Sequence, residues 1–174
     1  MKFLSFIGAL AILAAVAAGV YFFGGFYNIA ASEADPDIVA WALKSVRNAS
    51  ISRHATDAPA VKLEDPATIQ AGARAFATRG CTFCHGAPGV DYAKITEGMN
   101  PGPPGLKDEE EVRSLTAAQV FWIVKNGIGM TGMPSFSVAN VPDAEIWTIA
   151  AFVKKLPDVS DADFKAWTAD VAPK

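Results

Sequence analysis

The sequence predicts an all-α protein that begins with a membrane-spanning helix. Three observations support this prediction: an uncharged apolar run opens the chain, helix-capping signals recur behind it, and strand signals are scarce. No stretch sustains the alternation that marks a half-buried strand, and Asn126-Gly127 suits a helix end better than a hairpin. The formal net charge is −3 and the sequence carries no basic patch, which argues against nucleic-acid binding.

Residues 1–25 are predicted to form a transmembrane anchor. The run from Phe3 to Phe23 carries no charge, and about 20 helical residues span the hydrocarbon core of a bilayer. A cleavable signal peptide usually has a shorter apolar region, of about 7–15 residues, followed by a small-residue cleavage site. Only the weak candidate IAAS, at 29–32, follows this run. An uncleaved anchor is therefore favoured over a removed signal and over a buried helix of a soluble protein.

The charges on either side of the anchor predict its orientation. Lys2 and the amino terminus precede the apolar run, whereas Glu33, Asp35 and Asp37 follow it. Positive charge is retained on the cytoplasmic side of a membrane. We therefore expect a single-pass protein of the inner membrane whose remaining residues face the periplasm.

The juxtamembrane segment, residues 26–64, is predicted to contain a helix of roughly five turns after Pro36. Its apolar positions fall on two adjoining faces, with Ile38, Trp41 and Ser45 on one and Val39, Leu43 and Val46 on the other. Such a helix could pack on its own domain, lie in the membrane interface or dock on another subunit. We favour docking, because the aromatic sequence FGGFYN before the helix is unlike a flexible tether.

Residues 65–174 are predicted to form the compact domain, with helices marked by their ends. An Asp-Pro pair or a capping box is a typical helix start, and glycine or a following proline is a typical stop. These signals predict helices from Asp65-Pro66 to Gly80, from Thr116 to Gly127 and from Asp143 to Pro157, with a short last helix over Ser160 to Ala169. Between Gly86 and Arg113 lies a long loop rich in glycine and proline, which something other than regular secondary structure is expected to hold.

The sequence CTFCHG, at residues 81–86, contains the only two cysteines of the chain. A thioredoxin-like redox pair needs a βαβ setting, which the sequence does not show, and a structural zinc ion needs four ligands. The only other histidine is His54, far upstream, and a plain disulfide would leave the adjacent His85 unexplained. In c-type haem attachment, two cysteines three residues apart bond the vinyl groups and the next histidine ligates the iron. We therefore expect Cys81, Cys84 and His85 to bind one covalent haem c.

A six-coordinate haem iron needs a second axial ligand, and the candidates are Met99, Met130, Met133 and His54. Methionine more often fills a hydrophobic core than binds a metal. Met133, however, lies in GMTGMPSF, where glycines allow close backbone approach and a proline stiffens the turn after the sulfur. We expect Met133 to be the iron ligand. A thioether paired with histidine raises the reduction potential and fills the position that oxygen or peroxide would need.

These motifs resemble those of class I c-type cytochromes, in their small single-haem bacterial form, over residues 65–157. The resemblance is carried by CTFCHG, by PPGL at 103–106, by NGIGMTGMPSF at 126–136 and by the terminal helix WTIAAFVKKLP. It implies a small all-α cytochrome c fold, with three or more helices wrapped around one covalent haem. This chain departs from short members of the family in a longer insert, APGVDYAKITEGMNPG, between the haem motif and the prolines.

The resemblance also implies a helix crossing in the domain. The first helix is expected to cross the last at Gly72, which has Phe76 one turn later and Ile149 and Phe152 facing it. A glycine inside a helix costs about 1 kcal/mol against alanine, so a close crossing would explain its presence.

Two further features concern the surroundings of the haem. By the resemblance, the carbonyl of Pro104, or of the neighbouring Pro103, accepts a hydrogen bond from His85 and so orients the ring. Trp122 and Trp147 could donate to the haem propionates, but we expect both to be ordinary core aromatics at helical spacing.

The predicted function is outer-sphere electron transfer between redox proteins by a membrane-anchored monohaem cytochrome c. It is not catalysis on a small-molecule substrate. The expected partners are other subunits of a membrane complex, which would make the chain a fixed subunit of a larger membrane oxidoreductase or respiratory complex. Two alternatives remain open: a tethered shuttle between a quinol-oxidising complex and a terminal oxidase, and a haem enzyme or sensor with a labile sixth ligand.

Overall fold

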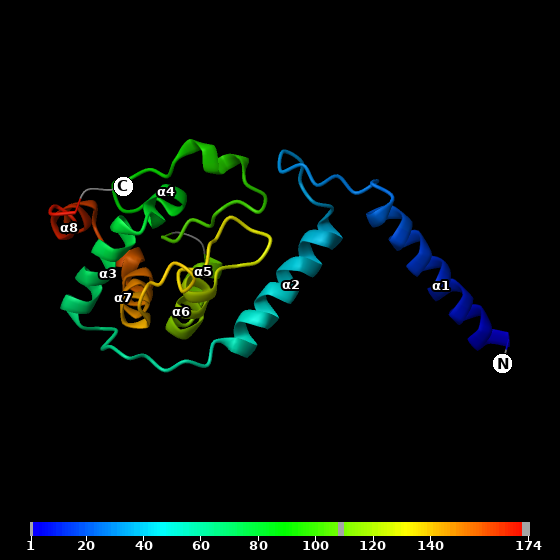
Figure 1. Ribbon diagram of the computed structural model, residues 1–174, viewed down its shortest axis with the longest axis horizontal. Helices are drawn as coiled ribbons and strands as arrows, with labels where there is room; N and C mark the ends of the chain where they lie inside the picture. The colour runs from blue at the N-terminus through cyan, green and yellow to red at the C-terminus, as the bar shows by residue number, and fades with distance from the viewer. Residues whose placement is uncertain (1, 108–109, 172–174) are drawn as a thin grey trace. The chain divides into compact units, whose positions relative to one another are not determined.

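The computed structural model describes residues 2–107 and 110–171. Every regular element in these ranges is helical, and the β contact found among them is an isolated bridge between Ala87 and Val90. The predicted all-α class is therefore confirmed (Figure 1). The chain divides into two compact units between Ala34 and Asp35, so this boundary falls inside the predicted juxtamembrane segment.

The first unit consists of α1 (Lys2–Phe23) and the turn that follows it. α1 has no buried residue and is long and apolar enough to cross a membrane, properties that an anchor shares with a signal sequence. After Gly24 the chain folds back, and the centroid of the Tyr27 ring lies 5.2 Å from that of Phe22 and 6.1 Å from that of Tyr21. The apolar helix thus ends in a compact aromatic turn.

The second unit contains the remaining helices, including the single 3-10 turns η1 and η2. They are α2 (Asp37–His54), α3 (Pro66–Thr78), α4 (Cys81–His85), η1 (Lys94–Gly98), α5 (Glu110–Ser114), α6 (Ala117–Asn126), α7 (Asp143–Lys155), η2 (Leu156–Asp158) and α8 (Asp161–Trp167). The predicted starts of α3 and α6 are confirmed. The Asp65 carboxylate accepts the amide of Ala67 at 3.0 Å, and Thr116 and Gln119 form the capping box.

The segment between Gly86 and Arg113 contains short elements, of which η1 was predicted by no sequence signal. η1 and part of α5 lie within it, and Ala87 and Val90 exchange backbone hydrogen bonds of 2.8 and 2.9 Å. Thr96 has 1% of its surface exposed, and its Oγ1 donates to the carbonyl of Ala93 at 2.8 Å. Local hydrogen bonds and one buried threonine therefore hold this segment in place of a longer regular element.

The helix predicted after Pro36 is confirmed as α2, and its end packs on its own domain. Ile51 is buried, the Gln119 side-chain amide donates to Ser52 Oγ at 3.3 Å, and the His54 ring stacks on Trp122 with 6.0 Å between centroids. The first part of α2 leaves four large apolar side chains exposed: Ile38, Trp41, Leu43 and Val46. Packing on its own domain, one of the three expected possibilities, is thus observed for the last turns of α2.

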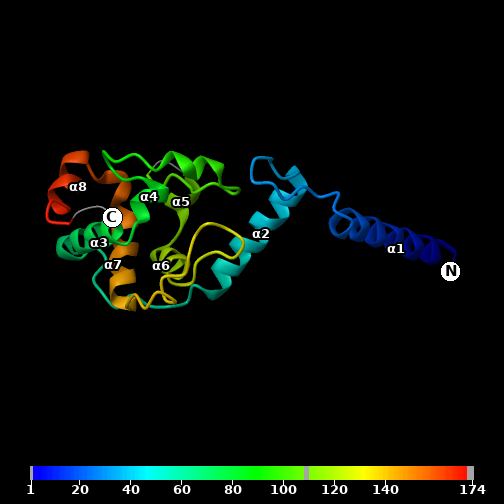
Figure 2. The ribbon, with the colours of Figure 1, turned by 45° about the horizontal axis from the view of Figure 1, so that its top comes forward.

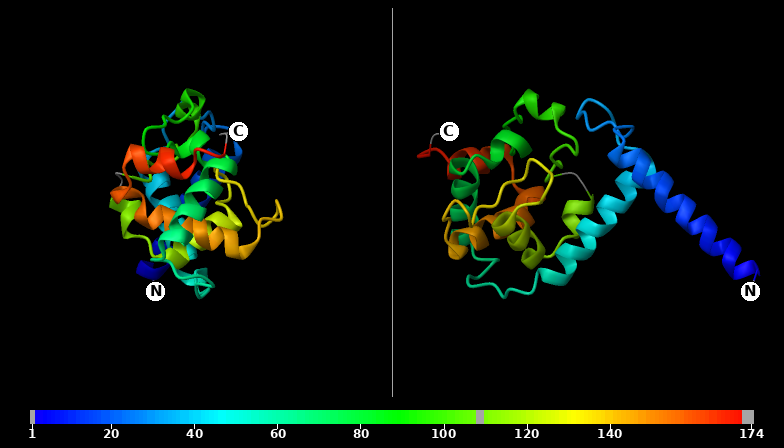
Figure 3. Two further views of the ribbon diagram at one scale, coloured as in Figure 1. Left: turned by 90° about the vertical axis from the view of Figure 1, so that its left-hand side faces the viewer. Right: turned by 45° about the vertical axis from the view of Figure 1, so that its right-hand side comes forward.

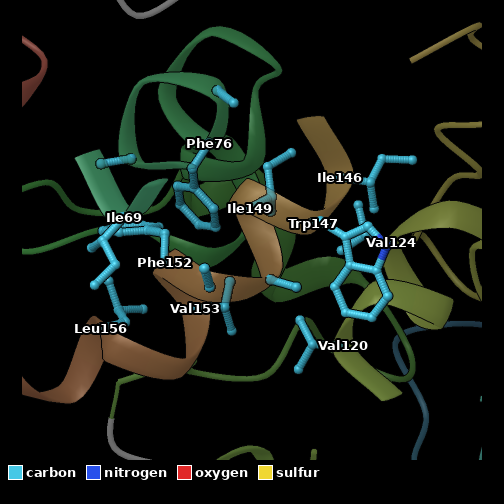
Figure 4. Packing of buried hydrophobic residues seen from close by; sticks show 14 of the residues in the cluster. Ile69, Phe76, Val120, Val124, Ile146, Trp147, Ile149, Phe152, Val153 and Leu156 are labelled. Carbon is cyan, nitrogen blue, oxygen red and sulfur yellow. The ribbon is translucent and has the colours of Figure 1, made fainter. Parts of the chain in front are cut away.

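The hydrophobic core lies where α3, α6 and α7 meet (Figure 4). Phe121 stacks on Trp147 with 4.0 Å between ring centroids, and Phe76 meets Phe152 edge-on at 5.3 Å. Trp147 is 2% exposed, which confirms it as a core aromatic. The same prediction is wrong for Trp122, which is only half-buried and lies outside the core cluster, with the His54 ring of α2 stacked on it.

α3 and α7 cross in direct backbone contact at Gly72, and Figures 2 and 3 show the two helices from further directions. A Cβ atom built on Gly72 would overlap the backbone carbonyl of Thr148 and lie 2.8 Å from Cβ of Phe152. The predicted crossing at Gly72 is therefore confirmed, with Phe152 facing it as expected. The closest approach is made by the backbone of Thr148 and not by the side chain of Ile149, which is buried in the core.

We expect Gly72→Ala to lower the free energy of unfolding by about 2–3 kcal/mol, because the added methyl group meets backbone atoms that cannot move aside. Gly98→Ala is the matched control, since a Cβ at Gly98 meets nothing within 4 Å. Denaturant unfolding of the haem-loaded protein measures both variants. Equal stability of the two would show that the crossing tolerates a side chain and would contradict the packing described above.

Candidate functional site

The candidate site is centred on the single helical turn α4, which two glycines delimit. Gly80 before it has φ +80° and Gly86 after it has φ +63°, so the chain turns sharply at both ends. Cys81 and Cys84 lie one turn apart on α4, are half-buried, and form no disulfide in the described structure. The geometry therefore presents two thiols on one face of a short, sharply bounded helix.

Burial raises the pKa of the Cys81 thiol to about 12, so this thiol is protonated and neutral at physiological pH. Desolvation disfavours the thiolate and leaves the neutral form as the stable one. A thioether carries no proton and no charge, so the same apolar surroundings suit a cysteine that is bonded to carbon.

The His85 ring is oriented by a backbone carbonyl. Its Nδ1 lies 2.9 Å from the carbonyl oxygen of Pro104. A carbonyl oxygen can only accept a hydrogen bond, so Nδ1 carries the proton and, in the neutral ring, Nε2 carries the lone pair that can bind a metal. The hydrogen bond expected of Pro104 is present, and it involves this proline rather than Pro103.

The segment that carries Met133 is fixed to the end of α6. We call residues 127–136 the ligand loop. At Gly127 φ is +69°, and a Cβ there would lie within 2.8 Å of the Met133 carbonyl oxygen. The amide of Ile128 donates to that same oxygen at 3.1 Å, and the amide of Phe136 returns to the carbonyl of Val124 at 3.2 Å. Only glycine suits position 127, because both the backbone angle and the space exclude a side chain.

The four candidates for the second axial ligand differ in their surroundings. Met133 is half-buried and packs against the hydrophobic core. Met130 is 88% exposed, and His54 stacks on Trp122 of α6. Met99 is half-buried, with its sulfur against the backbone of Gly132. Burial against the core therefore favours Met133, and Met99 is the nearest competitor.

The residues present fit a covalently bound haem. Cys81 and Met133 pack against one hydrophobic cluster, together with Leu106 and Phe136, so thiol, thioether and apolar side chains share the same surroundings. The imidazole has the proton arrangement that iron ligation requires. Two pockets beside Lys154 include neither cysteine, nor His85, nor Met133; the first is lined in part by Leu106.

Comparison with known proteins agrees with this set of residues. The family model described as "Cytochrome C oxidase, cbb3-type, subunit III" matches residues 67–153, which is half of the chain. Neither the curated proteins nor the solved structures give a significant match. The matched region is a c-type cytochrome domain, which implies haem c with its iron and confirms the resemblance to class I cytochromes. The chain therefore belongs to the cbb3-type subunit III family of cytochromes and is a haem-containing electron-transfer protein.

Proposed function

We propose that this chain is a membrane-anchored cytochrome c with one haem, and that it passes electrons between redox proteins as a fixed subunit of a membrane oxidoreductase. The observation that carries the proposal is the hydrogen bond from His85 Nδ1 to the Pro104 carbonyl. It gives the histidine of a C-x-x-C-H motif the tautomer and the restraint that an iron ligand needs.

In this proposal Cys81 and Cys84 would hold the haem covalently, and His85 and Met133 would ligate its iron. The haem supplies an iron that alternates between the ferrous and ferric states. The protein holds the ligands still: α4 is bounded by glycines, and the ligand loop is fixed at both ends to α6. Because the ligands stay in place, little reorganisation accompanies the electron.

The first unit supports attachment to a membrane. α1 is an apolar helix of 22 residues, and the aromatic cluster of Tyr21, Phe22 and Tyr27 at its end suits the membrane–water interface. Lys2 before the helix and the acidic residues after it support a periplasmic location for the second unit.

A fixed position in a complex is supported by α2. Its last turns pack on α6, so the helix is an extension of the haem domain and not a flexible tether. Ile38, Trp41 and Val46 nevertheless remain 70, 65 and 68% exposed. Such a group of apolar side chains is stabilised when a partner covers it. The family is named for an oxidase subunit, which supports a partner of the same class.

We expect Met133→Ala to keep the covalent haem but to lose the iron–thioether charge-transfer absorption. The reduction potential should fall and the reduced protein should bind carbon monoxide, because the sixth position becomes open. Met130→Ala, which removes an exposed methionine of the same loop, should change neither property. Absorption spectroscopy and redox titration of both variants measure these changes. If Met130→Ala shows them and Met133→Ala does not, the ligand is Met130.

We expect Cys81→Ala or Cys84→Ala to weaken haem-dependent staining on a denaturing gel, and the double variant to abolish it. Each substitution removes one covalent bond to the haem. Phe83→Ala lies in the same turn, changes a half-exposed side chain and should stain like the parent protein. Staining retained by the double variant would exclude covalent attachment at these cysteines.

We expect replacement of both Trp41 and Leu43 by Ser to release the protein from its complex, with haem spectra and membrane attachment unchanged. Truncation of a buried interface tryptophan often costs about 2 kcal/mol or more. The matched control replaces Ile95 and Val138, two exposed apolar residues outside α2, by Ser in the same way. Co-purification from mild detergent measures the effect. If the α2 variant still co-purifies with its partners, the tethered shuttle is the better description.

A further inference from the structure

We propose that Met99 is a positioning residue that holds the tip of the ligand loop in place and so keeps Met133 on the iron. Met99 lies near the end of the insert, residues 87–102, which the sequence comparison with short cytochromes leaves without a role. The proposal rests on the function proposed above, with Met133 as axial ligand.

The contact between Met99 and Gly132 carries the proposal. A Cβ atom built on Gly132 would lie 2.9 Å from Sδ of Met99 and 3.4 Å from its Cε. Among the described residues, and apart from its chain neighbours, no other residue comes within 4 Å of that position. The thioether side chain of Met99 therefore lies against one side of Gly132, the residue that precedes Met133.

The insert connects this contact to the turn that carries His85. The amide of Ala93 donates to the carbonyl of Phe83, in α4, at 2.8 Å. Buried Thr96 then donates from Oγ1 to Ala93, and the amide of Met99 donates to the carbonyl of Thr96 at 3.1 Å. A short chain of hydrogen bonds thus runs from α4 to Met99, and Figures 1 and 2 show the segment after η1 approaching the ligand loop.

The tip of the ligand loop has few other restraints. Its two ends are bonded to α6, and the hydrogen bonds that the tip forms with described residues are internal: Thr131 Oγ1 donates to the Ile128 carbonyl at 2.8 Å and accepts the Met133 amide at 3.1 Å. Met130 is 88% exposed, and a Cβ on Gly129 would meet nothing within 4 Å. Met99 therefore restrains from outside a tip whose own hydrogen bonds are internal, in addition to the packing of Met133 on the core.

If the tip lifted, Met133 would no longer be held where it could ligate the iron, and an added ligand could bind there instead. In the ferric holoprotein, the rate of imidazole binding measures how often this happens. We expect Met99→Ala to raise that rate about tenfold while the thioether absorption remains, because the ligand is kept and only its restraint is lost. Met99→Leu keeps most of the side-chain volume and should stay within about twofold of the parent.

Gly132→Ala tests the same contact from the other side. The added methyl group must displace Met99, so this variant should also speed imidazole binding. In the Met99→Ala background the same substitution should add nothing, because the two changes act on one contact. Ile95→Ala, at a 75% exposed position of the insert, is the control and should leave the rate unchanged.

Hydrogen exchange at the amides of Ile128, Thr131 and Met133 gives a second readout, and exchange should be faster in Met99→Ala than in Ile95→Ala. The positioning role alone would be overturned if Met99→Ala bound imidazole and exchanged its amides at the rates of the parent protein while Met133→Ala lost the thioether absorption. Loss of the thioether absorption in Met99→Ala would also overturn it, by making Met99 the ligand. Retention of that absorption in Met133→Ala would overturn the proposed ligand and the positioning role together.

Discussion

The backbone contact of α3 and α7 at Gly72 is the constraint on which the rest of the domain depends. α3 leads directly into the turn at Gly80, so the crossing fixes where α4 and its cysteines begin. α7 packs on α6, whose last residues hold the ligand loop. Arg79 adds a bidentate ion pair to Glu145 of α7, with N–O distances of 2.7 and 3.0 Å, although exposed pairs of this kind contribute only about 0–1 kcal/mol. Both halves of the candidate site are therefore positioned by one crossing.

The parts of the fold that depend on local chemistry could be predicted from the sequence. Capping residues mark helix ends within one turn of the chain, so Asp65 and Thr116 identified the starts of α3 and α6 correctly. The motif at 81–86 was informative for a similar reason, because its spacing suits covalent haem attachment better than a redox pair, a zinc site or a plain disulfide. The hydrogen bond from His85 to Pro104 spans 19 residues, and only the resemblance to known cytochromes predicted it.

The features that sequence reasoning missed are set by contacts between distant segments. Trp122 has the same helical spacing as a core residue, but it lies outside the core cluster and is half-buried, with His54 of α2 stacked on it. No periodicity marks η1, in which Thr96 is buried against the rest of the domain. Met99 was one of the candidate iron ligands, but nothing in the sequence indicates that its side chain contacts Gly132. These contacts exist only once the helices are assembled.

The packing of α2 on α6 also bears on how the rate of electron transfer would depend on conditions. A carrier that diffuses to its partner reacts at a rate that rises with concentration and falls with added salt when opposite charges guide the encounter. If α2 docks on a partner as proposed, the haem domain joined rigidly to it would already be at that partner, and the transfer would become a first-order step. Its rate would then follow the fixed separation of the two redox centres, and neither dilution nor ionic strength would change it while the complex stays intact.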